Sequence, residues 1–250
     1  MDLNCEELDK ASLGIIPNPL KLLRALMRPN QPFVMINMLS YKQQATGDYA
    51  HLTGEEAYEV YVKSVEKVQR PLGSRLLWSG QIRHDMAESK FPSFDAIGLL
   101  EYASPKAFLQ ANFKGKTSIK ARSAGLRGQW LIASTTLAEG ELPDPDEEHA
   151  VMIELSGGMK QDLKTLKRWF GVRQSTYKVV GAKTLWYGYC DHHVLGTAKP
   201  EIKDVLVTWF PNPTALEKAV HGSHRKEHTQ SIRPYLKYTA SPIDLLHELR

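Results

Sequence analysis

The stretch Gly73-Ser-Arg-Leu-Leu-Trp-Ser-Gly80 decides the expected fold, because it recurs 108 residues later as Gly181-Ala-Lys-Thr-Leu-Trp-Tyr-Gly188. The same displacement carries Pro105 onto Pro213. A repeat unit of this size is too long for a solenoid and large enough to be a small domain. The sequence therefore predicts two similar modules.

Each copy predicts the element order β-α-β-β-α-β, which is the ferredoxin-like pattern. Thr53-Gly-Glu-Glu56 is a capping-box signature, so a helix starts there, and Pro71-Leu-Gly73 ends it. The other helices and the strands follow from apolar periodicity and turn residues. Strands are expected at 33–39, 75–82, 94–102, 129–134, 149–155, 183–189, 204–210 and 235–240, and further helices at 105–112, near 118, at 161–180 and from 213.

This element order predicts how the two modules pack and how the chain divides into segments. A sheet of this kind leaves one face uncovered by its helices, and two such sheets can bury these faces against each other. We therefore expect an α+β fold, with two ferredoxin-like modules packed sheet to sheet as an intramolecular dimeric α/β-barrel. The segments are a lead-in with a short amphipathic helix at 1–31, a first module at 32–137, an acidic, proline-containing linker at 138–148 and a second module at 149–250.

The composition excludes several classes of protein. The chain has a net charge of +4 but no dense Lys/Arg run interleaved with aromatic residues, so no nucleic-acid partner is expected. No apolar run approaches the ~20 residues that span a bilayer. The first residues are acidic where a signal peptide would be basic, and Cys5 and Cys190 follow no redox or metal spacing. We expect a cytoplasmic protein with no membrane partner.

Several motifs of the first copy occur in a fixed order. They are Met35-Ile-Asn37-Met-Leu, Gly54-Glu-Glu-Ala-Tyr58-Glu-Val-Tyr61, the Gly73–Gly80 stretch, Glu101-Tyr102-Ala-Ser-Pro105-Lys-Ala-Phe108 and Arg122-Ser-Ala-Gly-Leu126. With these motifs, residues 30–137 closely resemble the DUF1330 family of the dimeric α/β-barrel superfamily. The second copy resembles the superfamily more loosely.

The resemblance implies two sheets packed face to face, with pockets between sheet and helices. It does not imply one reaction, because the superfamily includes cofactor-free monooxygenases, polyketide cyclases, decarboxylases and haem-handling enzymes. The family often has a His before the Arg of its second helix. Here that position is Ala121, so a proton-transfer role for that His is absent from the first copy.

His221-Gly-Ser-His224-Arg-Lys-Glu-His228 is the densest group of titratable side chains. On a helix, the three imidazoles would share one face. They could ligate a metal or haem, or act as a general acid/base, whereas the alternative is a solvated helix end. No carboxylate completes a usual zinc set, so no metal site is predicted. His224 and His228 are the candidate catalytic residues.

Four polar residues of the first copy are further candidates. Arg122 could bind a carboxylate or enolate oxygen with its planar fork, or form a structural ion pair with Asp95 or Glu101. Asn37 could hold a substrate carbonyl or bond a neighbouring loop. Tyr58 and Tyr61 share the inner face of a helix; Tyr61 is a candidate catalytic residue, and Tyr58 a candidate substrate contact.

Trp78 and Trp186 occupy matched positions in the repeat. Aromatic residues there are typical of a core, and the other interpretation is substrate binding. We include both as candidate substrate-binding residues. The copies agree in residues that build the framework and differ in polar ones, such as Asn37 against Glu154, so the function is expected to be asymmetric.

The predicted function is a cofactor-independent small-molecule enzyme, acting by proton transfer or as a cyclase, decarboxylase or monooxygenase on an aromatic or polyketide-like carbonyl metabolite. The alternatives are a non-catalytic ligand-binding module and a haem- or metal-binding barrel protein. No cofactor is predicted, and the partner is a small molecule. The sequence leaves open whether the chain also forms a homodimer.

Overall fold

The computed structural model describes seven segments of the chain, which are residues 31–85, 94–114, 119–141, 149–157, 162–195, 202–223 and 234–242. The expected lead-in helix after Pro19 lies outside the described residues, as do His224 and His228. The described helices include none that is both long enough and apolar enough to cross a membrane.

The elements alternate along the chain as the sequence predicts. The first half contains β1 (Phe33–Tyr41), α3 (Gly54–Gln69), β2 (Arg75–Asp85), β3 (Ala96–Tyr102), α4 (Pro105–Lys114), α5 (Ile119–Gly125) and β4 (Leu126–Glu139), with short 3-10 turns η1 (Gly47–Tyr49) and η2 (Arg70–Leu72). The second half contains β5 (Ala150–Gly157), α6 (Leu163–Lys178), β6 (Lys183–Leu195), β7 (Ile202–Phe210), α7 (Pro213–Ser223) and β8 (Pro234–Pro242).

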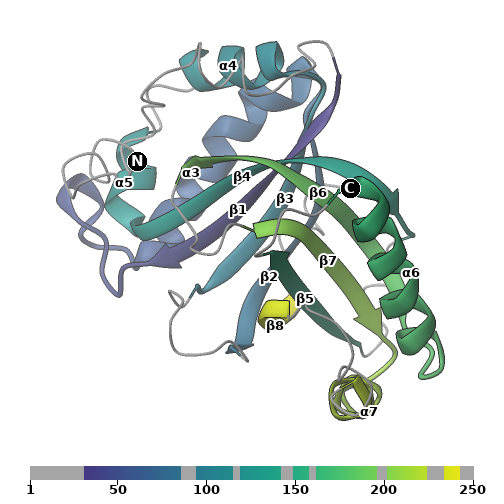
Figure 1. Cartoon of the computed structure of the whole chain (residues 1–250). Coiled ribbons are helices and arrows are strands. Elements are labelled where there is room, and N and C mark those ends of the chain that lie inside the picture. Colours follow the sequence, from purple (N-terminus) through teal and green to yellow (C-terminus); the bar gives the residue numbers. More distant parts are fainter. Residues whose placement is uncertain are drawn as a thin grey trace.

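The strands form one closed antiparallel barrel in the order β1-β3-β2-β8-β5-β7-β6-β4 (Figure 1). Read by halves, the order is β4-β1-β3-β2 and then β8-β5-β7-β6, so both halves arrange their four strands in the same way. The halves join along two edges, where β2 pairs with β8 and β4 pairs with β6. This arrangement confirms the expected α+β class.

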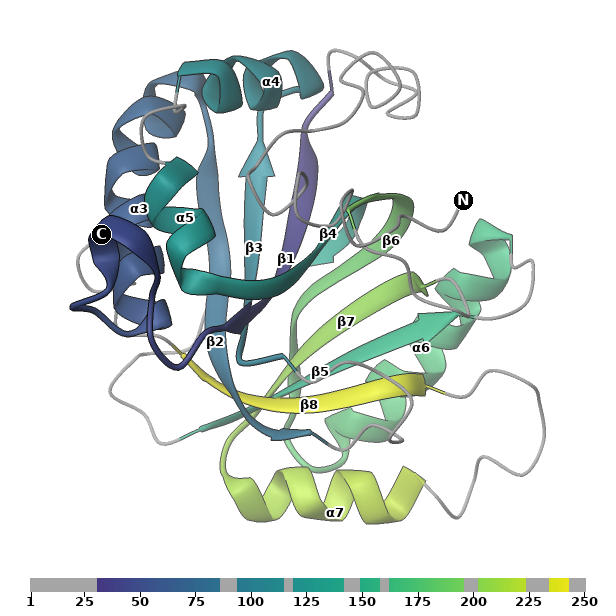
Figure 2. The ribbon, with the colours of Figure 1, turned by 90° about the vertical axis from the view of Figure 1, so that its left-hand side faces the viewer.

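The helices lie outside the barrel (Figure 2). Apolar side chains fill its inside. The interior core contains residues of both halves, such as Ile36 and Ile132 from the first and Ile153 and Val207 from the second. Separate apolar clusters lie between the strands and helices, on the other face of the sheet. Because strand side chains alternate between faces, the sequence neighbours of interior residues point toward the helices.

Local signals in the sequence are confirmed by the structure. Thr53 and Glu56 form the predicted capping box, with Glu56 N donating to Thr53 Oγ1 at 3.2 Å and Thr53 N to Glu56 Oε2 at 2.7 Å. The repeated glycines Gly73 and Gly181 both have φ of 78°, a left-handed conformation that favours glycine after a helix. The two matched glycines thus share one backbone conformation.

Strands β4 and β6 are longer than the sequence predicts. β4 continues to Glu139, two residues into the expected linker, and β6 continues to Leu195. The extra residues of each strand pair with the predicted part of the other strand. Thr135 to Glu139 lie opposite Tyr189 to Trp186, and Cys190 to Leu195 lie opposite Ser134 to Leu131. A partner strand from the other half supplies the hydrogen bonds that extend both strands, and no local pattern could signal it.

Candidate functional site

Arg122 is the most unusual polar residue of the first half. It lies on α5, is 5% exposed, and donates from Nη2 to the Gln129 side chain on β4. Its Nε has no acceptor among the described residues, and no described carboxylate forms an ion pair with it. A buried charge normally has a partner of opposite sign, because removing it from water is costly. Arg122 is therefore a candidate anion-binding group.

Two tyrosines of α3 lie beside this guanidinium. The Arg122 Cζ atom lies 5.4 Å from the centre of the Tyr61 ring, within range of a cation–π interaction. The Tyr58 and Tyr61 rings are also 5.4 Å apart. Burial raises the pKa of the Tyr58 phenol, the nearby Tyr61 raises it further, and Arg122 acts in the opposite direction. Tyr58 is therefore a neutral hydrogen-bond donor near pH 7.

The sheet below these residues carries small and polar side chains on its helix-facing side. Asn37 on β1 lies opposite Gly98 on β3, and Gly98 lies opposite Ser79 on β2. A Cβ atom built on Gly98 would have no neighbouring atom within 4 Å, so this row borders open space. The Ser79 hydroxyl is buried, and no described residue accepts or donates a hydrogen bond there.

The matched row of the second half is filled. Glu154 lies opposite Leu206, which lies opposite Tyr187, so larger side chains occupy the places of Asn37, Gly98 and Ser79. Tyr187 is fully buried, and Phe170 of α6 stacks on its ring with centroids 4.3 Å apart. The open space therefore exists in the first half and is closed in the second.

A buried ion pair completes the packing of the second half. Arg173 Nη2 donates to Asp204 Oδ2 at 2.6 Å, and the Tyr187 hydroxyl donates to the same oxygen at 2.9 Å. Arg173 Nη1 also donates to the Ser156 hydroxyl at 3.2 Å. The stacked Phe170 and Tyr187 rings and this ion pair thus fill the layer between α6 and the sheet at these positions.

The structure brings together three of the residues expected from the sequence, namely Tyr58, Tyr61 and Arg122. Asn37 lies on the helix-facing side of the sheet of the same half. The expected alternative, an ion pair of Arg122 with Asp95 or Glu101, is wrong. Glu101 pairs with Arg75, Oε1 to Nε at 2.9 Å, and Asp95 accepts from the backbone N of Tyr41 at 2.6 Å. The Asn37 side chain donates to the Met35 carbonyl of its own strand at 3.0 Å.

Trp78 and Trp186 are not brought to this site. Both side chains lie in the interior core, on the opposite face of the sheet, with exposures of 3% and 1%. The Trp186 ring crosses over Gly188, where an added Cβ would lie 2.0 Å from the ring. Their expected role as substrate contacts is therefore corrected to core packing, and Gly188 is required by the ring above it.

The histidine cluster stays a prediction, because the side chain of His221 and the whole of His224 and His228 lie outside what the structure describes. Within the described part of the chain, no group of three His, Cys, Asp or Glu side chains could hold a metal ion.

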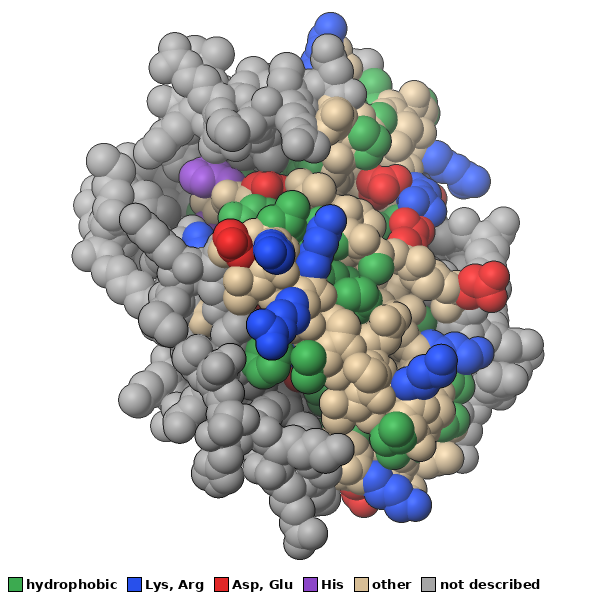
Figure 3. All heavy atoms as spheres, turned by 45° about the vertical axis from the view of Figure 1, so that its right-hand side comes forward, with side chains coloured by type: hydrophobic (Ala, Val, Ile, Leu, Met, Phe, Trp, Pro, Cys, Tyr) green, Lys and Arg blue, Asp and Glu red, His purple; other side chains and the backbone are tan. Residues whose placement is uncertain are grey.

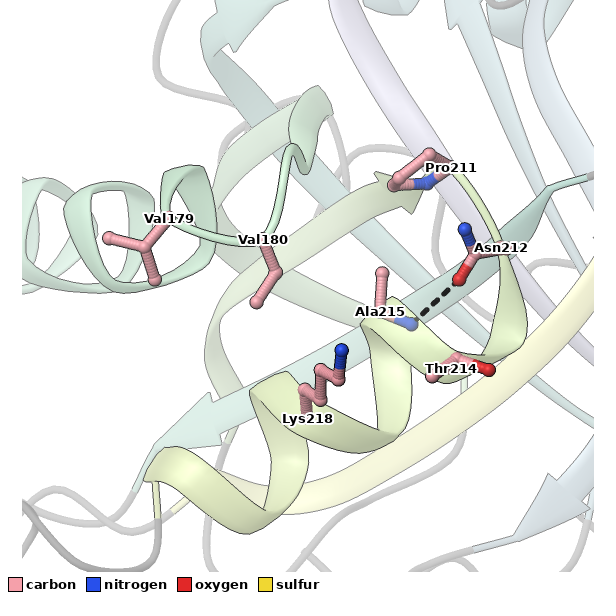
Figure 4. Close-up of a pocket in the computed structure, with 7 residues that line it drawn as sticks. All are labelled: Val179, Val180, Pro211, Asn212, Thr214, Ala215 and Lys218. Atoms are coloured by element: carbon pink, nitrogen blue, oxygen red, sulfur yellow. Dashed lines mark hydrogen bonds between the residues drawn. The ribbon is translucent and has the colours of Figure 1, made fainter.

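A hollow of about 470 Å³ lies elsewhere, between the end of α6 and the start of α7 (Figure 4). Asn212 is engaged there in capping α7, since its Oδ1 accepts from Ala215 N at 2.9 Å. Val179 is 83% exposed, so the hollow is shallow and open to solvent. Lacking an acid and base that converge, it is a weaker candidate than the Arg122 region. The lining residues are Val179, Val180, Pro211, Asn212, Thr214, Ala215 and Lys218.

On the face shown in Figure 3, the described Lys and Arg side chains do not gather into one positively charged patch. Lys and Arg side chains are spread there among acidic and apolar ones. The polar groups that do converge are those around Arg122. Among them, Gln129, Ser79 and Gly98 were not expected from the sequence, and only their strand register reveals them.

Known structures share this fold. A chlorite dismutase from Candidatus Nitrospira defluvii is 12% identical with a TM-score of 0.50, over 90% of this chain and 98% of that chain. The protein provisionally named chlorite dismutase TA0507 is 12% identical with a TM-score of 0.51, over 87% and 99%. A protein provisionally named a monooxygenase, from Lactobacillus acidophilus NCFM, is 12% identical with a TM-score of 0.47, over 85% and 94%.

The chain shares its α+β barrel fold with the first two of these structures. At this identity the similarity extends to the fold alone. No family model matches the chain, and no curated protein matches it in sequence. The resemblance to the DUF1330 family therefore stays a prediction.

Proposed function

We propose that the chain is a cofactor-independent small-molecule enzyme whose substrate binds between α3, α5 and the sheet of the first half. The proposal includes an origin of the barrel in two tandem ferredoxin-like modules, supported by the equal strand order of the halves. The observation that carries the function is Arg122, a buried guanidinium beside a neutral Gln129 and above an open row of the sheet.

The chemistry follows from the charge of the groups around this space. When a proton leaves a carbon next to a carbonyl, the electron pair forms a C=C bond and negative charge develops on the carbonyl oxygen. Arg122 would hold that oxygen, and the neutral Tyr58 phenol would donate a second hydrogen bond to it. The acceptor of the proton would be a neutral imidazole, for which His224 and His228 are the candidates predicted from the sequence.

The site is proposed for the first half alone. In the second half, Tyr187 and Leu206 occupy the matched positions, and Arg173 is already neutralised by Asp204. This asymmetry supports one working site and one half that serves as framework.

Acetylacetone tests the proposal, because its enolate has a strong ultraviolet band. We expect the wild-type protein to increase the enolate fraction near pH 7, while Arg122→Gln loses most of this effect. Arg75→Gln is the matched control, since Arg75 is an exposed arginine paired with Glu101 outside the site. An equal enolate signal from wild type and Arg122→Gln would contradict the proposal.

Binding without catalysis is the second candidate. It is favoured by the donor character of the two groups nearest the open row, Arg122 and Tyr58, since neither can accept a proton near pH 7. One measurement distinguishes catalysis from binding, namely the rate at which the methyl protons of acetophenone exchange with D₂O, followed by NMR. An enzyme accelerates this exchange, whereas a binding module leaves its rate unchanged.

A further inference from the structure

Two matched positions of the sheet differ in charge between the halves. In the second half, Glu154 on β5 and Asp204 on β7 place carboxylates under α6, and both residues are buried. In the first half, the corresponding positions on β1 and β3 are Asn37 and Ala96. The register supports this match, because Asn37 and Glu154 both lie opposite the central residue of their row, Gly98 or Leu206.

The second half shows what a guanidinium binds in this layer. Asp204 Oδ2 accepts from Arg173 at 2.6 Å and from the Tyr187 hydroxyl at 2.9 Å. The carboxylate thus has one cation and one phenol as partners, and its single charge matches the single charge of the arginine. Its side chain is fully buried.

The first half also has a buried arginine and phenols in this layer, Arg122 on α5 and Tyr58 and Tyr61 on α3, but its matched sheet positions carry neither carboxylate. Arg122 binds Gln129, which lies two residues along β4 from Leu131, the residue opposite Asn37. Asn37 and Gln129, the partner of Arg122, are therefore diagonal neighbours on one face of the sheet, which are typically about 7–8 Å apart. Tyr58 packs on the apolar cluster that contains Ala96, the residue at the position matched to Asp204.

From this comparison we infer that the ligand of the first half is a monocarboxylate. Its carboxylate accepts a hydrogen bond from Arg122 and neutralises its charge, as Asp204 does for Arg173. The inference rests on the proposed location of the site and adds the substrate class. The single charge of a carboxylate balances the single charge of Arg122, as Asp204 balances Arg173 in the second half.

Asn37→Asp tests the inference without a ligand, because it changes charge and almost nothing in shape. In the presence of Arg122, the added carboxylate is expected to maintain or raise the melting temperature. Combined with Arg122→Gln, the same substitution is expected to lower it by several degrees. A double-mutant cycle of the four proteins measures this coupling. If Asn37→Asp changes the melting temperature equally in both backgrounds, the inference is overturned.

Benzoate and its neutral amide, benzamide, test the substrate class directly. We expect millimolar benzoate to raise the melting temperature of the wild type, and benzamide to leave it unchanged. Asn37→Asp and Arg122→Gln should both lose the benzoate shift, since one repels the carboxylate and the other removes its partner. A benzoate shift that persists in Asn37→Asp contradicts the inference.

Acetylacetone separates this inference from the function on which it rests. If acetylacetone enolate binds in an Arg122-dependent way and benzoate does not, the carboxylate assignment is wrong and the proposed function stands. If neither probe depends on Arg122, both are wrong. An Arg122-dependent effect of both probes supports both.

Discussion

Two buried arginines of this protein differ in one respect, the presence of an internal counter-charge. Arg173 has Asp204 at 2.6 Å, whereas Arg122 has the neutral Gln129 and the face of Tyr61. The effective penalty for a buried ion is several kcal/mol, while a hydrogen bond returns about 1 kcal/mol and a cation–π contact about 0.5–2 kcal/mol. Arg122 is therefore a net cost to the folded protein when no anion is bound.

Arg122→Met is expected to stabilise the ligand-free protein by about 1 kcal/mol, because it removes that cost and keeps most of the apolar contact. Urea unfolding followed by fluorescence measures the change. Arg75→Met, at an exposed ion pair, should shift stability by at most about 1 kcal/mol in the unfavourable direction. A clear loss of stability in Arg122→Met would mean that Arg122 serves the fold.

Tyr58 gives a prediction for alkaline pH. Its pKa is raised in the folded protein, so the unfolded chain loses this proton first as pH rises above the ordinary value near 10. The unfolded state then binds fewer protons, and the free energy of unfolding falls with pH. We expect Tyr58→Phe to reduce this slope by about one proton between pH 10 and 11.

The measurement is urea unfolding at several pH values between 8 and 11. Tyr49→Phe is the control. An unchanged slope in Tyr58→Phe would show that the phenol is not held in its neutral form.

At the scale of elements, the position of Arg122 depends on two glycines. The end of α5 meets the start of α3 at Gly125 and Gly54, where a Cβ on Gly125 would lie 2.2 Å from the Gly54 carbonyl oxygen. Lys42 N donates to the Gly125 carbonyl at 2.9 Å, and Gly54 N donates to the Lys42 carbonyl at 3.2 Å. These backbone contacts hold α5, and with it the guanidinium, over the sheet.

Gly125→Ala is expected to destabilise the protein by about 1–3 kcal/mol, because the new methyl group would force the two helices apart. It should also weaken anion binding, since α5 carries Arg122. Gly128→Ala is a matched control, because a Cβ there meets no atom within 4 Å. Thermal unfolding of both variants checks this, and equal melting temperatures would contradict the close approach.

At the scale of the whole molecule, the halves are joined by β4·β6 and β2·β8 and share one interior core. A half alone would expose that core and two strand edges, which is unfavourable in water. Since β6 and β8 hold the places of β2 and β4, a second copy of the first half could replace the second half.

A fragment of residues 31–141 is therefore expected to form a homodimer, in which β4 of one copy pairs with β2 of the other. Light scattering after gel filtration would show about twice the monomer mass at micromolar concentration. A folded, monomeric fragment would show that the first half does not need a partner.

The fold was largely predictable from sequence because its signals are local. The caps at Thr53, the left-handed glycines Gly73 and Gly181 and the strand periodicity act within a few residues of one another. The site was predictable in part, since Tyr58, Tyr61 and Arg122 carry chemistry in their own side chains. The sequence could not predict toward which face of the sheet Trp78 and Trp186 point. A register irregularity precedes each of them in its strand, and it decides which face the side chain lies on.

By itself, the sequence determined that an α+β fold forms and where most of its described helices and strands fall. Only the tertiary structure decided which half has the open row of the sheet. That depends on Asn37, Gly98 and Ser79 meeting across three strands, and on Tyr187 filling the matched place in the other half. The physical reason is that helix caps and turns are short-range, whereas space and counter-charge depend on residues far apart in the chain.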